Sequence, residues 1–326
     1  MKIAVLGAGA WGTALSLSLA ARHEVVLWCR DRRQADEMRR TQSNPRYLPG
    51  FVFPPALHIE TELQSTLASA KLALVVVPTS GFREVLKKIR GSEAPIVWGC
   101  KGFEADSAKL PHQVVEEELG QKAKAAVLSG PSFAEEVARG LPTAVTLASR
   151  DSHIARDIAR QLHGNRLRIY HGADVVGVEV AGAVKNVMAI AAGISDGMNL
   201  GNNARAALMT RALAEMTRLG LALGGRMETF MGLAGMGDLF LTASSDLSRN
   251  RRVGLMLAQG KTLSSILEEL GHVAEGVASA KEVQRLALTV NVDMPITHTI
   301  CRVLHDGLAP DVALTELLSR EPKAEH

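Results

Sequence analysis

The first fifteen residues, MKIAVLGAGAWGTAL, constrain the fold more than any other part of the sequence, because a short apolar run leads through three glycines into a helical pattern. Gly7, Gly9 and Gly12 have the spacing of the dinucleotide-binding motif, with the strand before it and the helix after it that the motif requires. The first glycine permits a tight turn, the second lets the backbone approach a pyrophosphate, and the third allows helix and strand to pack closely. A glycine-rich turn without a ligand is the alternative. The motif favours an α/β domain that binds a dinucleotide.

The first half of the chain alternates apolar, β-branched runs with amphipathic helical patterns. This alternation is typical of a doubly wound, mostly parallel sheet that helices cover on both faces. Parallel strands need crossover connections, and the spacing of the runs supplies them. Strands are expected at residues 3–6, 25–28, 72–77, 96–98, 125–128, 144–147 and 167–170, with helices such as 83–89 and 154–162 between them.

The pattern changes near Asp174, after which only helical segments are recognisable. Asp174, Thr262 and Pro310 stand where helix starts are expected. The first of these helices is rich in glycine and alanine, which suits a buried central helix. Because 326 residues exceed the usual size of one domain, we expect a Rossmann-like dinucleotide-binding domain over 1–178 and an all-α substrate-binding domain over 179–326. The expected helices span 174–198, 204–223, 251–259, 263–270, 276–288, 296–304 and 312–318.

Composition narrows the class of protein further. With 47% hydrophobic and 22% charged residues the chain is neither disordered nor fibrous, and a net charge of +3 does not favour nucleic acid or a membrane surface as the main partner. Cys29, Cys100 and Cys301 are odd in number and far apart, and the histidines lack metal-binding spacing, so no disulfide framework or metal site is expected. No targeting segment and no bilayer-spanning apolar stretch of about 18 residues is expected either, which favours a cytoplasmic protein.

The end of the second expected strand indicates which dinucleotide is bound. The sequence there is LWCRDRR, where NAD-binding proteins usually carry an acidic residue for the ribose hydroxyl. Arg30 follows the strand directly, and an arginine can pair bidentately with a 2′-phosphate. NADP(H) is therefore favoured, while the neighbouring Asp31 keeps NAD(H) open. A solvated basic turn is the alternative.

Further polar residues stand at the ends of strands or inside apolar helices. Lys101 follows an expected strand in WGCKGFE, and Pro131 and Ser132 in LSGPSFAEEV are expected in the first turn of a helix. Lys185 and Asn186 lie inside an otherwise small and apolar helical stretch. The lysine either extends to the surface or is functional, and the sequence alone leaves both possibilities open.

The segment from GLAGMGDLFLT to SSDLSRNRRVG adds candidates for substrate binding. It contains Asp238, followed by Ser248, Arg249 and Asn250 in a row. One guanidinium with two neutral hydrogen-bonding groups suits a phosphate, although a solvated basic loop is the alternative. No nucleophilic-serine motif is present. A nicotinamide-dependent enzyme of this kind therefore needs a side chain to supply its proton, and lysine is the available candidate.

Several blocks together resemble the bacterial-type NAD(P)-dependent glycerol-3-phosphate dehydrogenase family along nearly the whole chain. They are GAGAWGTALS, VPTSGFREVL, KGFE, LSGPSFAEEVARGLPTAV, EVAGAVKNVMAIAAGI, GLAGMGDLFLTASSDLSRNRRVG and VAEGV. The resemblance implies reversible reduction of dihydroxyacetone phosphate by NAD(P)H to sn-glycerol 3-phosphate for phospholipid synthesis, by a homodimer. Other readings are a two-domain dehydrogenase that acts on a hydroxy acid or sugar acid, and a redox-sensing protein that binds the nucleotide without turnover.

The resemblance also implies roles for residues at matching positions, with Lys185 as the catalytic proton donor and acceptor. Ala10 stands where the family often has serine, and loss of that hydroxyl is expected to weaken cofactor binding modestly, by about 1 kcal/mol. The implied substrate contacts are Lys101, Gly130, Ser132, Lys185, Asp238, Ser248, Arg249 and Asn250, and the implied cofactor contacts are Gly7, Gly9, Ala10, Trp11, Gly12, Arg30, Lys101, Ala134, Arg249, Val273 and Glu275.

Overall fold

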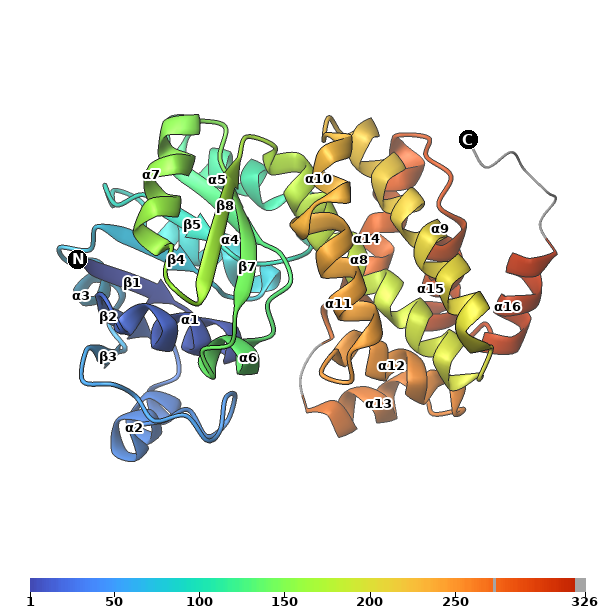
Figure 1. Cartoon of the computed structure of the whole chain (residues 1–326), viewed down its shortest axis with the longest axis horizontal. Coiled ribbons are helices and arrows are strands. Elements are labelled where there is room, and N and C mark those ends of the chain that lie inside the picture. The colour runs from blue at the N-terminus through green and yellow to red at the C-terminus, as the bar shows by residue number, and fades with distance from the viewer. Residues whose placement is uncertain (272–273, 320–326) are drawn as a thin grey trace. The chain divides into compact units, whose positions relative to one another are not determined.

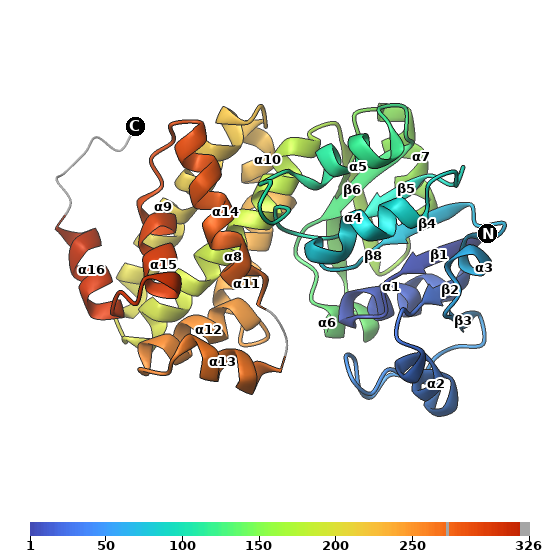
Figure 2. The ribbon, with the colours of Figure 1, turned by 180° about the vertical axis from the view of Figure 1, so that it is seen from behind.

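A computed structural model describes residues 1–271 and 274–319 of the chain. The chain forms two compact units (Figures 1 and 2). The first contains Met1–Glu104 and Lys109–Glu179, and the second contains Ala105–Ala108 together with the described residues from Val180 onward. Each unit has its own secondary-structure class.

The first unit is built on one eight-stranded sheet with the order β3-β2-β1-β4-β5-β6-β7-β8. All neighbouring strands are parallel except β6 and β7, which confirms the predicted, mostly parallel sheet. Strand order reverses on either side of β1, and ligands of such sheets bind at the carboxyl ends of the strands at that point. The strands are β1 (Lys2–Leu6), β2 (Glu24–Trp28), β3 (Leu57–Glu60), β4 (Leu72–Val75), β5 (Ile96–Trp98), β6 (Ala125–Ser129), β7 (Thr143–Ala148) and β8 (Leu167–Gly172).

Seven of these strands were predicted and β3 was missed. Five of the predicted strands, β1, β2, β4, β5 and β6, are buried over nearly their whole length, and in β1 Ile3 to Leu6 are all fully buried, because a parallel sheet is covered on both faces. In contrast β3 is a four-residue edge strand in which only Leu57 is buried. One buried position does not make a recognisable pattern.

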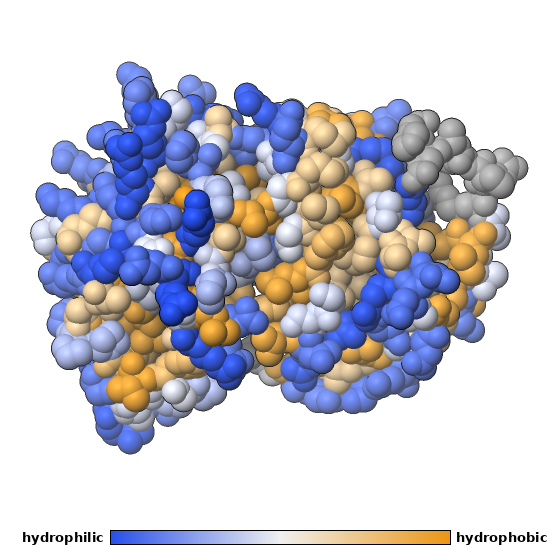
Figure 3. Space-filling view, viewed as in Figure 1, coloured by the Kyte–Doolittle hydropathy of each residue, from blue (hydrophilic) through white to orange (hydrophobic). Residues whose placement is uncertain are grey.

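Helices cover both faces of this sheet. Figure 1 shows α7 in front of it, with hydrophilic side chains over α7 and β8 in Figure 3, and Figure 2 shows α4 and α5 on the other face.

One expectation about the helices of this unit was wrong: Pro131 and Ser132 precede α6, which begins at Ala134 with Phe133 as its N-cap. The helices are α1 (Ala10–Ala20), α2 (Arg32–Thr41), α3 (Leu63–Leu67), α4 (Thr79–Lys88), α5 (Pro111–Leu119), α6 (Ala134–Ala138) and α7 (Ser152–Leu162).

After β8 every described element is helical, as predicted. Asp174 caps the first of these helices by accepting a hydrogen bond from the Gly177 N–H at 2.9 Å, and Thr262 caps α13. The segment 227–244 was not predicted to be helical but forms two helices and a π-helical turn. The elements are α8 (Val175–Gly197), α9 (Gly201–Ala222), α10 (Met227–Met231), the π-turn η1 (Leu233–Gly237), α11 (Asp238–Ser244), α12 (Arg249–Ala258), α13 (Leu263–Leu270), α14 (Glu275–Thr289), α15 (Pro295–His305) and α16 (Pro310–Leu318).

The long helix α8 is the buried centre of the second unit. By length and hydropathy it could cross a membrane, so the expectation of no such stretch was wrong, but 94% of its most apolar window is buried. Glycines let α12 cross it closely. A Cβ on Gly193 would lie 2.0 Å from the Arg251 carbonyl oxygen, and a Cβ on Gly254 would lie 2.1 Å from the Ile190 carbonyl oxygen. The two backbones therefore touch where neither residue has a side chain.

A buried carboxylate fixes α15 against α9. Glu215 is 1% exposed and accepts hydrogen bonds from the backbone N–H groups of Ile296 at 2.6 Å and Thr297 at 3.2 Å, and from the Thr297 hydroxyl. It thus caps the first turn of a helix that lies far along the chain. Burial raises the pKa of Glu215 to about 7, although these hydrogen bonds oppose the rise.

Candidate active site

The glycine motif forms the turn between β1 and α1. Gly7 has a φ of +126°, a backbone conformation that side chains disfavour, and a Cβ on Gly12 would lie 1.9 Å from the Gly7 carbonyl oxygen. A Cβ on Gly9 would meet no described heavy atom within 4 Å. The helix α1 starts at Ala10 with Gly9 as its N-cap, and its first N–H groups need acceptors from outside the helix. The turn therefore has an open backbone face at a helix N-terminus, which fits a pyrophosphate.

Two side chains that the sequence did not single out hold this turn. Asn44 is fully buried, and its amide donates to the Ala8 carbonyl at 3.0 Å and to the Thr13 hydroxyl at 2.8 Å. Gln34 donates to the same carbonyl at 2.9 Å. The carbonyl in the middle of the glycine motif thus points into the protein, and its hydrogen bonds fix the shape of the turn.

Arg30 lies two residues beyond the end of β2 and its side chain is exposed. The neighbouring Asp31 caps α2, because its carboxylate accepts hydrogen bonds from the backbone N–H groups of Arg33 at 2.9 Å and Gln34 at 3.3 Å. The acidic residue that kept NAD(H) open therefore has a structural role, while Arg30 stands just past the carboxyl end of the strand.

A second group of predicted residues gathers at the carboxyl ends of β5 and β6. The Lys101 ammonium donates to the Gly130 carbonyl at 3.3 Å, and the Ser132 hydroxyl donates to the same oxygen at 2.9 Å. Trp11 reaches this edge from α1, since a Cβ on Gly99 would lie 3.2 Å from its indole nitrogen. Ala134 and Trp11 both pack against one small apolar cluster. The structure thus brings together these predicted residues from three segments of the first unit.

In the second unit Lys185 is buried, and it does not extend to the surface. Its side chain forms an ion pair with Asp238 and donates a hydrogen bond to the Thr242 hydroxyl at 2.8 Å. Asp238 and Thr242 lie four residues apart on α11, so both face the same side of that helix. The Thr242 hydroxyl donates in turn to the Asp238 carbonyl at 2.7 Å. One ammonium group is therefore held in a fixed place inside an apolar helix bundle.

The residue after this lysine faces a different pair of helices. Neighbours on a helix point about 100° apart, and Asn186 meets α12 and α14 while Lys185 meets α11. The Asn250 amide donates to the Asn186 side-chain oxygen at 3.0 Å, and the Asn250 oxygen accepts from the Gly276 N–H at 3.0 Å. Glu275 accepts from the Asn186 amide at 3.4 Å. Glu275 and Asn250, both predicted, are thus linked through Asn186.

The Ser-Arg-Asn sequence is the start of α12 and not a loop. Ser248 is the N-cap and accepts a hydrogen bond from the Arg251 N–H at 3.2 Å. Ser248 and Asn250 are buried, while Arg249 is exposed at the first helical position. An exposed guanidinium beside the N-terminal end of a helix is well placed to meet an anion. Val273, another predicted contact, lies outside the described residues.

The first turns of α8 are anchored in the first unit by a buried carboxylate. Glu179 accepts hydrogen bonds from the Trp98 indole at 2.9 Å, from the His112 backbone N–H at 2.8 Å and from the His112 ring. Burial raises the pKa of Glu179, and the hydrogen bond and charge of His112 oppose the rise. Trp98 ends the strand that precedes Lys101, so this network also fixes the end of that strand. No set of three metal-ligating side chains is found among residues 1–271 and 274–319.

Comparison with known proteins agrees with this arrangement. Family profiles for the N-terminus and the C-terminus of NAD-dependent glycerol-3-phosphate dehydrogenase match residues 2–155 and 174–315. The chain is 58% identical to the glycerol-3-phosphate dehydrogenase (NAD(P)+) of Nitrosospira multiformis and 56% identical to that of Dechloromonas aromatica, over 100% of this chain and 99% of each of those proteins. A crystal structure of glycerol-3-phosphate dehydrogenase from Coxiella burnetii, 46% identical, superposes with a TM-score of 0.93 over 98% of this chain and 99% of that one.

Proposed function

The chain belongs to the NAD-dependent glycerol-3-phosphate dehydrogenase family, and we propose that it catalyses the reversible reduction of dihydroxyacetone phosphate by NAD(P)H to sn-glycerol 3-phosphate. The observation that carries the proposal is the buried Lys185, held by Asp238 and Thr242 in a helix bundle. Reduction of a ketone needs a proton at the new hydroxyl oxygen, and a lysine ammonium can supply it.

The cofactor supplies the hydride, and the first unit supplies the residues that fit it. The open backbone face at Gly9 and the N-terminus of α1 suit the pyrophosphate, and Asn44 and Gln34 keep that surface in shape. We assign Arg30 to the 2′-phosphate of NADP(H), which makes NADP(H) the preferred cofactor and leaves NAD(H) usable. Ala10, Trp11, Ala134, Glu275 and Arg249 complete the proposed cofactor contacts.

Lys185 acts on the carbonyl oxygen of the substrate in this proposal. As hydride adds to the carbon, negative charge grows on the oxygen, and the ammonium stabilises that charge and donates its proton. Asp238 and Thr242 each accept a hydrogen bond from this ammonium, so the two side chains fix its position in the helix bundle. In the reverse reaction the amine accepts the proton of the alcohol. Lys101 is proposed to contact the substrate and the cofactor, beside Gly130 and Ser132.

Arg249 binds the substrate phosphate in this proposal, with Ser248 and Asn250 beside it at the start of α12. A guanidinium can hold two phosphate oxygens at once, and the positive end of the helix adds to the attraction. Binding energy from this remote group positions the carbonyl for reaction. Substitution of the arginine is therefore expected to affect turnover as well as KM for the substrate.

Lys185→Ala tests the proposal. We expect turnover of dihydroxyacetone phosphate with NADPH to fall by about 100- to 10,000-fold. The substitution leaves the buried Asp238 carboxylate without its ammonium, so Lys185→Ala/Asp238→Ala, which removes both charges, is measured alongside with circular dichroism of each variant. Lys281→Ala, at an exposed lysine of α14, is the matched control and keeps wild-type turnover. A folded Lys185→Ala variant with near-normal turnover would remove the lysine from the mechanism.

The finer assignments are also proposals. Steady-state kinetics with dihydroxyacetone phosphate and either reduced cofactor tests the preference for NADP(H), and oxo acids as substrates test the alternative reaction. We propose that the enzyme is a cytoplasmic homodimer that supplies phospholipid synthesis. Light scattering after size-exclusion chromatography tests the dimer, and depletion of the enzyme in growing cells, followed by lipid labelling, tests the metabolic role.

A further inference from the structure

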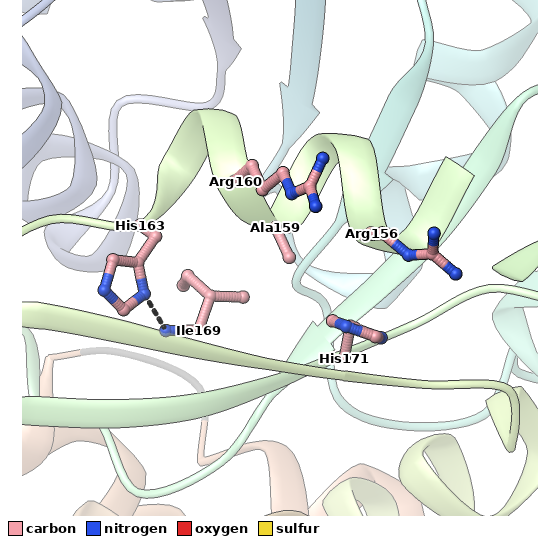
Figure 4. A pocket seen from close by; sticks show the side chains of 6 residues that line it. All are labelled: Arg156, Ala159, Arg160, His163, Ile169 and His171. Carbon is pink, nitrogen blue, oxygen red and sulfur yellow. Dashed lines mark hydrogen bonds between the residues drawn. The ribbon is translucent and has the colours of Figure 1, made fainter. Parts of the chain in front are cut away.

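A pocket of about 540 Å³ opens between α7 and β8 in the first unit (Figure 4). Two arginines and two histidines line it, together with an alanine and an isoleucine, and every ionisable group among them is basic. None of the residues assigned above to substrate or cofactor is one of them. The lining residues are Arg156, Ala159, Arg160, His163, Ile169 and His171.

The local structure explains why the pocket has an apolar floor and a basic rim. Arg156 and Arg160 lie one turn apart on the same side of α7, and the neighbouring Ala159 is 3% exposed. Alternation along β8 places His171 on the same face as Ile169, which is 7% exposed. Figure 4 shows Arg156 beside His171 at one end of the pocket and His163 beside Ile169 at the other.

The positive charge of the pocket is not neutralised within the described part of the chain. Neither Arg156 nor Arg160 has an ion pair there, and Asp157, which adjoins Arg156 on α7, pairs with neither of them. Arg83 and Arg251, in contrast, are each paired with carboxylates. Like charges one turn apart destabilise a helix. The two guanidiniums that line this concave surface therefore repel each other, and a bound anion would relieve that repulsion.

The end of α7 is also arranged so that it does not repel an anion. The His163 Nδ1 accepts a hydrogen bond from the Ile169 N–H at 3.3 Å, so a neutral ring carries its proton on Nε2. Arg22 donates to the carbonyls of His163 and Leu162, the latter at 3.0 Å. Since these carbonyls form the negative end of the helix dipole, Arg22 offsets their effect on the pocket.

We propose that this pocket binds the phosphate group of a small phosphorylated molecule. A phosphate monoester has three terminal oxygens and nearly two negative charges, which match two guanidiniums and two imidazoles better than the two oxygens and single charge of a carboxylate. The apolar floor of Ala159 and Ile169 contacts the carbon part of the ligand. The site is separate from the proposed dehydrogenase chemistry and does not depend on it.

Inorganic phosphate is the probe, followed by NMR of the full chain labelled with ¹³C-histidine. The His163 and His171 signals are assigned from His163→Gln and His171→Gln, so phosphate bound at other places is not counted. We expect saturable shifts of both signals, and a Kd raised at least about tenfold in Arg156→Gln/Arg160→Gln. Arg168→Gln is the matched control, because Arg168 stacks on Tyr170 on the opposite face of β8, and it keeps the wild-type Kd.

Two results would overturn the assignment. Equal shifts in the double variant, or equal shifts with chloride at the same ionic strength, would mean that the pocket has no phosphate site. Phosphatidic acid carries the same phosphate monoester in its headgroup, so the second arm is sedimentation with vesicles that contain phosphatidic acid. If the protein does not sediment with the vesicles, the ligand is a small soluble molecule. If it sediments and the double variant does not, the ligand is a membrane lipid instead.

Discussion

The crossing of α8 and α12 provides the sharpest test of the structure, through Gly254→Ala. A Cβ at this position would lie 2.1 Å from the Ile190 carbonyl oxygen and 2.7 Å from the Ile194 nitrogen. Both are backbone atoms of a buried helix, so they cannot rotate away as the end of a side chain could. The new methyl group therefore has to push the two helices apart.

The size of the effect follows from these distances. Real Cβ contacts essentially never fall below 3.0 Å, so the helices must separate by about 0.9 Å at the crossing. Overpacking of a core costs roughly 1–3 kcal/mol, and a clash with backbone belongs at the upper end. For a domain of about 150 residues, 3 kcal/mol lowers Tm by roughly 6–12 °C. The same shift would lengthen the 3.0 Å hydrogen bond between Asn250 and Asn186 beyond bonding distance. We therefore expect turnover to fall too, by about 100-fold.

Calorimetry and NADPH oxidation with dihydroxyacetone phosphate measure the two effects. Gly81→Ala in α4 is the control for stability, because it adds the same methyl group to a helix where a Cβ meets no described heavy atom within 4 Å. That variant is expected to be as stable as the wild type or more so, by up to about 1 kcal/mol. If Gly254→Ala melts within about 2 °C of the wild type and retains its turnover, the close crossing is wrong.

Three further predictions concern the cofactor and the pH dependence of stability. Arg30→Ser is expected to raise KM for NADPH by about 10- to 100-fold and leave KM for NADH unchanged, and equal effects on both would remove Arg30 from the 2′-phosphate. Asn44→Ala, which removes a buried donor from the glycine turn, is expected to weaken NADPH binding in a fluorescence titration and to lower unfolding free energy by about 1–3 kcal/mol, whereas Ser43→Ala leaves both unchanged. Glu215 has a pKa raised to about 7 from the value of 4.5, so the folded state holds a proton that the unfolded state has lost between these pH values, and its contribution to stability falls as pH rises through this window, by ~3 kcal/mol. Glu215→Gln keeps an acceptor for Ile296 and removes this slope in urea unfolding measured from pH 4.5 to 8, and an unchanged slope would exclude Glu215 as its source.

The sheet and most helices could be predicted because their signals are local. Strands buried on both faces have continuous apolar runs, and caps such as Asp174 and Thr262 mark helix starts within three residues. The segment 227–244 lacks these signals. Its glycines indicate a loop, yet a Cβ on Gly235 would lie 2.2 Å from the Phe230 carbonyl, so this glycine allows a close fold of the chain onto itself. No local sequence pattern distinguishes such a glycine from one in a flexible loop.

Site residues were predictable one by one, but most of their partners were not. The family resemblance implies that Asp238 lies near Lys185, yet 53 positions separate them and nothing in either stretch by itself indicates that they pair. Asn44 was missed entirely, because an asparagine in a polar loop has no pattern, and its importance comes from the Ala8 carbonyl 36 positions away. Hydrogen bonds between distant segments depend on the packing of whole elements, which one sequence does not specify.

The glycines of the opening motif and those of α8 and α12 meet the same physical demand, although only the first set was assigned a function from the sequence. A Cβ on Gly12 would meet the Gly7 carbonyl at 1.9 Å, and a Cβ on Gly193 would meet the Arg251 carbonyl at 2.0 Å. In both places the absence of a side chain allows two backbones to come close together. This close approach sets the positions of the polar groups that the two backbones carry. The small residues of α8 were interpreted only as packing. Because that packing sets α12 against α8, it also decides that Asn250 reaches Asn186, so the crossing is part of the site as much as the side chains are.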